Sequence, residues 1–283
     1  MRNRILAAFR NLDRSKEVLR CSNEVPDWRN LTLAYLGLKK PHYPYCLHVR
    51  GLHPVVLEEI SDLWAFWQVF LRRIYNVSAS DLVILDAGAN IGFFTLLAAR
   101  ESPSSRIIAL EPFPSTFRRL VENVKNNGLT ERVTCLNFAL ADSTELRCMD
   151  LMPQFSQRRR VDRQISARKM ESAVVPTTTL ACLFQDLHIS RLDLLKMDIE
   201  GDEYAVLYST PSRILQNIRR IALEYHPEIE QNTCEELIAF LCRAGFKLER
   251  DVRDREGYGV AQLSQTSSAS ASCNPNRAVW NRY

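Results

Sequence analysis

The stretch Val83 to Phe94, VILDAGANIGFF, decides the fold of this chain of 283 residues. It begins as a short apolar run, turns through Gly88 and Gly92, and continues as an apolar helical pattern to residue 100. A strand that turns through glycine into a helix begins a doubly wound α/β sheet, and such sheets bind ligands beyond the carboxyl ends of their strands. Glycine permits the tight turn and a close approach of a ligand to the main chain. We therefore expect an α/β fold with a ligand site at this turn.

The alternation of strands and helices continues downstream of the turn. Strand patterns occupy residues 82–88, 106–112, 133–140, 192–200, 220–226, 246–252 and 258–264, and helical patterns occupy residues 91–100, 114–128, 211–220 and 235–244. This order predicts a mostly parallel seven-stranded sheet with helices on both faces and a C-terminal antiparallel hairpin strand. A capping box from Thr233 to Glu236 predicts the start of the last helix.

A further helix is predicted over residues 61–75, upstream of the first strand. Phe66 and Phe70 fall on one apolar face at helical spacing, and Ser61 is the predicted N-cap. A helix that packs into the core is the main interpretation, and an aromatic lid over a pocket is the alternative.

Composition bounds the organisation of the chain. A net charge of +4, with 46% hydrophobic and 25% charged residues, is ordinary for a globular protein and does not indicate a strongly basic nucleic-acid-binding face. No apolar run reaches the roughly 18 residues of a membrane-spanning helix, and the apolar residues 5–9 are too few for a signal-peptide core. We expect an N-terminal preamble at residues 1–54, a main domain at 55–263 and a disordered Ser-rich tail at 264–283.

The eight cysteines are scattered along the chain and form no C-x-x-C pair, which argues against a zinc site. Several fall within apolar strand or helix patterns, where cysteine acts as a small hydrophobic residue. We therefore expect free thiols in a reducing compartment and a cytoplasmic protein.

The spacing of the glycines in this turn limits the classes of ligand that it can bind. Asn90 and Phe93 stand where the dinucleotide-binding turn G-x-G-x-x-G has its later glycines, and the chain has no G-x-x-x-x-G-K-[ST] motif. These differences exclude an NAD-dependent dehydrogenase and a P-loop nucleoside triphosphatase. S-adenosylmethionine (SAM) carries a carboxylate and an ammonium in place of a phosphate, and the amides of the turn and Asp86 match these charges.

The ends of the next strands supply further cofactor residues. An acid at the position of Glu111, at the end of the second strand, accepts both hydroxyls of a ribose. The loop after the third strand, with Asn137, Ala139 and Asp142, is expected beside the adenine. The residues predicted to bind the cofactor are Asp86, Gly88, Asn90, Gly92, Phe93, Glu111, Pro112, Asn137, Ala139 and, after the fourth strand, Asp198.

The stretch KMDIEGDE, residues 196–203, stands at the end of the fourth strand. Together with LDAGANIGFFT, EPFPSTFRRLVENV and LEYHP, it resembles the FkbM-type methyltransferase family over about residues 55–262, and the helix from Ser61 to Tyr75 is similar to the segment before the family's core. The resemblance implies a Rossmann-like class I methyltransferase fold and SAM-dependent methyl transfer to a hydroxyl of a sugar or secondary metabolite. The chain departs from the family at Ala181-Cys182, where members often have an acidic pair, so a role for that acid is not carried over.

Three ionisable residues stand at neighbouring strand ends in this fold: Asp198, Glu224 and His226. His226 titrates near neutral pH and suits a general base that activates an alcohol. Alternatively, Asp198 and Glu224 bind a hard cation such as Mg²⁺, which acidifies the hydroxyl. The alternative is structural: Glu200 and Glu203 cap the following helix, because acids favour a helix N-terminus, and His226 has a structural role.

Two other functions stay open. The Arg-rich segment at residues 157–169 is either a solvated loop or a clamp for RNA or another acidic acceptor. The sequence D-I-E-G replaces the D/N-P-P-Y/F motif of base N-methyltransferases, which argues against methylation of a base but not of an RNA hydroxyl. An inactive methyltransferase-like binding module is the second alternative, and the intact site residues argue against it. The expected partner is a small-molecule or glycan acceptor.

Overall fold

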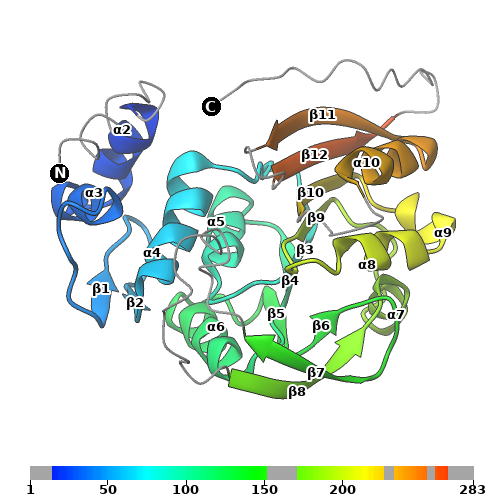
Figure 1. Ribbon diagram of the computed structural model, residues 1–283, viewed down its shortest axis with the longest axis horizontal. Helices are drawn as coiled ribbons and strands as arrows, with labels where there is room; N and C mark the ends of the chain where they lie inside the picture. The colour runs from blue at the N-terminus through cyan, green and yellow to red at the C-terminus, as the bar shows by residue number, and fades with distance from the viewer. Residues whose placement is uncertain (1–14, 152–170, 226–232, 254–258, 267–283) are drawn as a thin grey trace.

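The computed structural model describes residues 15–151, 171–225, 233–253 and 259–266. Its centre is a seven-stranded sheet with the order β11-β12-β10-β9-β3-β4-β5 (Figure 1). The strands are β3 (Val83–Ala87), β4 (Arg106–Leu110), β5 (Val133–Leu136), β9 (Leu194–Met197), β10 (Arg220–Tyr225), β11 (Phe246–Arg253) and β12 (Gly259–Gln265). β3, β4, β5, β9 and β10 pair in parallel, and β12 runs antiparallel to both of its neighbours. The predicted fold class is confirmed.

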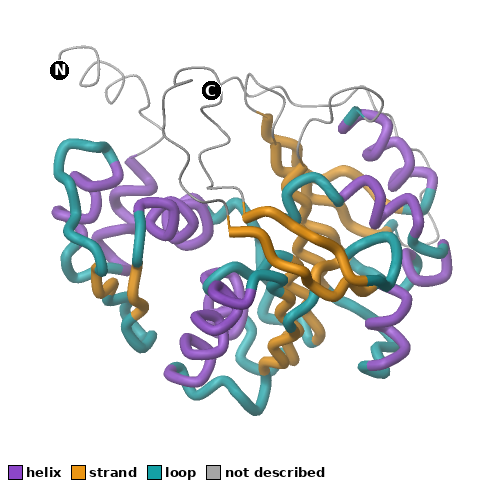
Figure 2. The backbone as a smooth tube through the Cα atoms, turned by 60° about the horizontal axis from the view of Figure 1, so that its bottom comes forward, coloured by secondary structure: helices purple, strands orange, loops and turns teal. Residues whose placement is uncertain are grey.

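Helices cover both faces of the sheet, as Figure 2 shows. α5 (Phe93–Glu101) and α6 (Pro114–Asn126) pack on one face, and α7 (Leu180–Asp186), α8 (Glu203–Ser209), α9 (Ser212–Leu215) and α10 (Cys234–Arg243) pack on the other. Side chains of a buried strand alternate between faces, so Ile107 joins the first core cluster and Ile108 the second. The predicted capping box of Thr233 and Glu236 begins α10.

The third predicted strand is divided in the structure. After β5 the chain leaves the main sheet, and β6 (Ala139–Leu140) pairs with β8 (Glu171–Thr178), which also pairs with β7 (Leu146–Leu151). The break lies at Asn137, whose side-chain amide donates hydrogen bonds of 2.8 Å to the two carbonyl oxygens that follow β4. The Arg-rich segment follows β7 in the sequence and lies outside the described residues, so its role as a clamp stays a prediction.

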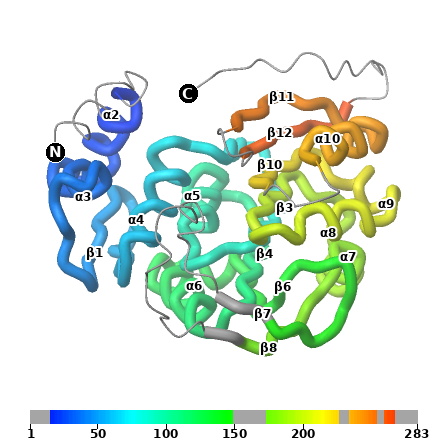
Figure 3. Tube along the Cα trace, viewed as in Figure 1, coloured from blue at the N-terminus to red at the C-terminus, as the bar shows by residue number. Residues whose placement is uncertain are grey.

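The N-terminal segment packs on the same face of the sheet as α5. Its elements are α2 (Ser15–Glu24), α3 (Trp28–Tyr35), β1 (Tyr45–Leu47) and β2 (Val55–Leu57), and Figure 3 shows them in blue beside α4. Cys21, Leu31 and Leu47 belong to the core cluster that contains Ile84 of β3. β1 and β2 pair with each other, so the expected division after residue 54 falls between two paired strands and stays a prediction.

The structure also bears on the expectations about membrane-spanning helices, cysteines and the C-terminal tail. Across the described ranges, no helix is both long and apolar enough to span a bilayer. The seven cysteines in these ranges are free, as expected. The tail expected from residue 264 begins within β12, and residues 267–283 lie outside the description.

The predicted helix before the first strand is α4 (Ile60–Phe66), which continues directly as the π-helix η2 (Trp67–Arg72). Phe66, Trp67 and Phe70 are at most 1% exposed, which confirms the core-packing interpretation over the lid. The prediction of Ser61 as N-cap is wrong, because Ser61 lies inside α4 and Glu59 holds the cap position. Asp62 stabilises this end instead, since its carboxylate accepts a 2.7 Å hydrogen bond from the amide of residue 58.

Candidate functional site

The turn after β3 has the conformation that its glycines predict. Gly88 and Gly92 have φ of +73° and +97°, and Asn90 has φ of +52°, a value that asparagine tolerates better than most residues. A Cβ at residue 88 would lie 1.8 Å from the carbonyl oxygen of Asp198. The close approach that Gly88 permits is therefore made by the end of β9 in this structure, where the sequence led us to expect a ligand.

Asp86 and Lys196 form a buried ion pair below the turn. Lys196 Nζ lies 3.1 Å from Asp86 Oδ1 and donates a 2.7 Å hydrogen bond to the carbonyl oxygen of Gly88. Thr95 Oγ1 donates to Asp86 Oδ2 at 2.6 Å. Burial lowers the pKa of Lys196, but the carboxylates of Asp86 and Asp198 outweigh burial and raise this pKa above its usual value. Asp86 is fully buried with these partners, so its contact with a cofactor stays a prediction.

Tyr75 joins the ends of β9 and β10. Its hydroxyl donates a hydrogen bond of 2.8 Å to Glu224 Oε2 and lies 3.3 Å from Asp198 Oδ2. Burial and then the two carboxylates raise the pKa of Tyr75 well above its usual value, so the hydroxyl stays protonated and remains a donor. The structure thus brings Asp198 and Glu224 together, and their catalytic roles stay predictions.

Tyr75 and Lys196 were not among the residues that the sequence placed in the site. A signal existed for Lys196, because it stands two residues before Asp198 within the strand predicted over residues 192–200, and so on the same side of that strand. No local signal existed for Tyr75, which is 123 residues from Asp198 in sequence.

Glu111 braces the glycine turn from the end of β4. Its Oε2 accepts a 2.9 Å hydrogen bond from the amide of Asn90, and its Oε1 accepts a 3.0 Å bond from the amide of Phe113. Burial raises the pKa of Glu111 to about 7, although these two amides oppose the rise. Both carboxylate oxygens therefore lie at the carboxyl end of the sheet, beside the turn predicted to hold the cofactor.

The remaining predicted cofactor residues serve mainly the packing around this turn. Phe93 is 3% exposed and packs its ring 5.5 Å from that of Phe66, so only its backbone is left to face a cofactor. Asn137 binds the carbonyl oxygen of the half-buried Pro112, and Ala139 is buried in β6. Direct contacts of these residues with a cofactor stay predictions.

The loop after β9 is fixed by Glu203, the first residue of α8. This carboxylate is fully buried and accepts hydrogen bonds from the amides of Ile199 at 3.0 Å and Gly201 at 2.9 Å. These contacts support the structural alternative for Glu203, because the acid holds the loop and favours the helix start. Asp198, at the start of the same loop, keeps 30% of its side chain exposed and is accessible to a ligand.

The predicted base and metal ligands are described only in part. His226 lies outside the described residues, so its role as a base stays a prediction. Within the ranges described, no group of three or more His, Cys, Asp or Glu side chains is arranged to hold a metal ion. Mg²⁺ is commonly held by one or two carboxylates with water. Tyr75 contacts one oxygen of each carboxylate, Asp198 Oδ2 and Glu224 Oε2, and the metal alternative for these two acids stays a prediction.

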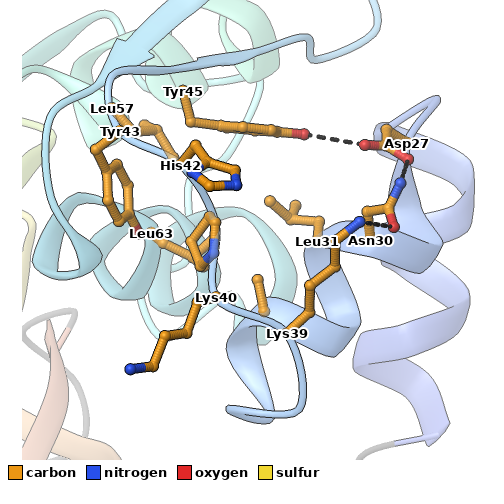
Figure 4. Close-up of a pocket in the computed structure, with 12 residues that line it drawn as sticks. Asp27, Asn30, Leu31, Lys39, Lys40, His42, Tyr43, Tyr45, Leu57 and Leu63 are labelled. Carbon is orange, nitrogen blue, oxygen red and sulfur yellow. Dashed lines mark hydrogen bonds between the residues drawn. The ribbon is translucent and has the colours of Figure 1, made fainter.

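A cavity of about 180 Å³ lies in the N-terminal segment (Figure 4). Three leucines and the rings of Tyr43 and Tyr45 form its walls, and none of the predicted cofactor residues lines it. Its lining includes an acid, Asp27, as well as Lys39 and Lys40, so it selects neither an anion nor a cation. The cavity therefore assigns no class of ligand.

Comparison with known proteins gives the family of this chain. Its residues 86–248, more than half of the chain, match the methyltransferase FkbM domain. The chain is 27% identical to the 31-O-demethyl-FK506 methyltransferase FkbM of Streptomyces tacrolimicus, over 63% of this chain and 79% of that protein. It is 24% identical to the hexuronic acid methyltransferase AglP of Haloferax volcanii, over 69% of this chain and 80% of that protein. It is also 25% identical to the AMB antimetabolite synthetase AmbE of Pseudomonas aeruginosa, over 65% of this chain but only 10% of AmbE. The chain therefore belongs to the methyltransferase FkbM domain family.

Proposed function

We propose that this protein is a SAM-dependent methyltransferase whose site lies at the carboxyl ends of β3, β4, β9 and β10. The observation that carries the proposal is the contact of the Gly88 turn with Asp198, because it joins the expected cofactor turn to the acids of the next strands. The carboxylate of Glu111 is suited to bind the ribose of SAM. Each oxygen of Glu111 accepts one backbone amide and has capacity for a second hydrogen bond, as two ribose hydroxyls require.

We infer that the methyl acceptor is a hydroxyl of a sugar or secondary metabolite. The names of FkbM and AglP, which describe methylation of a demethyl-FK506 oxygen and of a hexuronic acid, support this class. When bound, SAM supplies a methyl group on a positively charged sulfur. As the acceptor oxygen gains this methyl it loses its proton, and a carboxylate at the strand ends is suited to receive it. Asp198 is an accessible acid there, and Glu224 contacts the same hydroxyl of Tyr75.

Cofactor binding is the first test. Calorimetry of the full chain with SAM should give one site per chain, and Glu111→Ala should weaken it by more than tenfold, since a carboxylate that accepts two hydroxyls is lost. A wild-type chain that binds no SAM would refute the proposal and revive the inactive binding module.

Label transfer from methyl-labelled SAM to sugars, secondary metabolites, lipids and RNA then identifies the acceptor. Transfer to RNA with a steep salt dependence would replace the proposed acceptor class. Asp198→Asn should reduce turnover by at least about a hundredfold if its carboxylate takes up the proton. The matched control is Asp186→Asn, an exposed acid at the end of α7, which should keep wild-type turnover.

The metal requirement has a separate test. We propose that Asp198 and Glu224 act with Tyr75 between them and need no cation. Turnover that survives exhaustive chelation supports this arrangement, whereas loss of turnover with recovery on added Mg²⁺ would assign both carboxylates to the metal.

A further inference from the structure

Tyr75 is anchored to the sheet through its two neighbours in sequence. Gln262 of β12 donates a 2.8 Å hydrogen bond to the carbonyl oxygen of Ile74. Arg220 of β10 donates a 3.1 Å bond to the carbonyl oxygen of Asn76. The backbone on both sides of Tyr75 is therefore tied to β12 and to β10, the strand that carries Glu224.

Contacts with its ring also restrict the side-chain conformation of Tyr75. Its ring packs edge-on against Phe94 in the first turn of α5, with centroids 5.5 Å apart. Lys196 Nζ lies 5.5 Å from the centre of the ring, a cation–π contact. The residue is 2% exposed, so burial and these contacts leave the hydroxyl a single direction, toward the carboxylates of Asp198 and Glu224.

Two carboxylates at adjacent strand ends repel each other, and a hydrogen-bond donor between them stabilises their charged forms. The hydroxyl of Tyr75 is such a donor, at 2.8 Å from Glu224 and 3.3 Å from Asp198. Its one proton bonds to one acid at a time, and the shorter distance gives that bond to Glu224. Asp198 Oδ2 lies near the same hydroxyl at the longer distance, and 30% of the Asp198 side chain stays exposed to a ligand.

We propose that Tyr75 is a positioning residue, which sets Asp198 and Glu224 as an acidic pair toward the positive charge of the cofactor. This inference rests on the proposed function. Because Tyr75 precedes the matched residues 86–248, the functional unit extends upstream of the family domain. SAM and S-adenosylhomocysteine differ at this point, since the sulfur is positively charged in SAM and neutral in S-adenosylhomocysteine. A role in orienting the acids must therefore affect the two ligands differently.

The test compares both ligands by calorimetry on the full chain. Tyr75→Phe keeps the ring and removes the hydroxyl, so the dissociation constant of SAM should rise about fivefold to tenfold. That of S-adenosylhomocysteine should change by less than about twofold, because the neutral sulfur gains little from the acids. Asp198→Asn should also raise the dissociation constant of SAM. Tyr75→Phe should raise this constant less in the Asp198→Asn protein than in the wild-type chain.

Tyr225→Phe is the matched control. The hydroxyl of Tyr225 also donates a 2.8 Å hydrogen bond to a carboxylate, that of Asp251, and the residue is fully buried. Tyr225 packs in the second core cluster, so its loss should leave both affinities unchanged while melting temperature reports any lost stability.

Two results would overturn the inference. One is a folded Tyr75→Phe protein with wild-type affinity for SAM. The other is an equal loss of SAM and S-adenosylhomocysteine, which a general structural defect would cause. A wild-type chain that binds neither ligand would refute the proposed function itself, and the role of Tyr75 would fall with it.

Discussion

Gly88→Ala is expected to force apart the ends of β3 and β9. The added Cβ would lie 1.8 Å from the carbonyl oxygen of Asp198, whereas real Cβ contacts are essentially never shorter than 3.0 Å. The obstacle is backbone on both sides, so no side-chain rotation relieves it. The turn or the strand end must move, and both belong to the proposed site.

The magnitude follows from three contributions. Alanine in a left-handed conformation costs about 1–2 kcal/mol. Separation of the strand ends breaks the 3.2 Å hydrogen bond from the Asp198 amide to the Ala87 carbonyl, worth about 1 kcal/mol. It also disrupts the 2.7 Å bond from Lys196 Nζ to the Gly88 carbonyl, worth about 2 kcal/mol because the donor is charged. We expect the free energy of unfolding to fall by about 4–5 kcal/mol in total.

Gly128→Ala is the control variant, because it has the left-handed conformation without the close approach. Gly128 has φ of +67°, nearly that of Gly88, but a Cβ there would meet nothing within 4 Å. Urea unfolding should therefore show a loss of only about 1–2 kcal/mol for Gly128→Ala, with SAM binding intact. Equal losses for the two variants, or a Gly88→Ala protein that binds SAM as the wild type does, would refute the reasoning.

Three further predictions concern Glu111, Asp81 and Thr233. The pKa of Glu111 is about 7 in the folded chain against an ordinary value of 4.5, so the folded state binds more protons between these values and stability falls as the pH rises from 4.5 to 7. Urea unfolding across this range should show that Glu111→Gln removes a decline of about 3 kcal/mol, and an unchanged slope would contradict it. Asp81 is fully buried between Arg219 and Arg220, so Asp81→Asn should cost about 3 kcal/mol, while Asp142→Asn at an exposed ion pair should cost less than about 1 kcal/mol. Thr233→Ala should lower the stability measured by thermal unfolding by about 1 kcal/mol, and Thr233→Ser should restore it if the capping box is responsible.

Much of the fold follows from patterns that are local in sequence. The glycine turn after β3, the apolar strands that alternate with helices and the capping box at Thr233 each depend on residues close together in the chain. Glu111 and Asp198 could be placed for a similar reason, because the carboxyl ends of parallel strands meet at one edge of the sheet.

Where prediction from sequence was wrong, side-chain contacts with the backbone or with a distant segment were responsible. The strand expected through residue 140 ends early because Asn137 binds carbonyl groups that follow β4. Ser61 is not the N-cap because Asp62 of α4 binds the preceding backbone and also pairs with Arg119 of α6 at 2.6 Å. The contacts of Asn137 with the end of β4 and of Asp62 with Arg119 join segments that are distant in sequence, so the local pattern does not predict them.

The sequence by itself determined the turn, its glycines and the acids that end the strands. Only the tertiary structure decided what these parts face: Gly88 makes room for the backbone of Asp198, and Tyr75 reaches the acids of β9 and β10 from 123 and 149 residues away. The physical reason is that turns and strands form from neighbouring residues, whereas a buried hydroxyl is directed by every element packed around it. The stretch VILDAGANIGFF therefore predicted where a site would lie, and packing selected the residues that complete it.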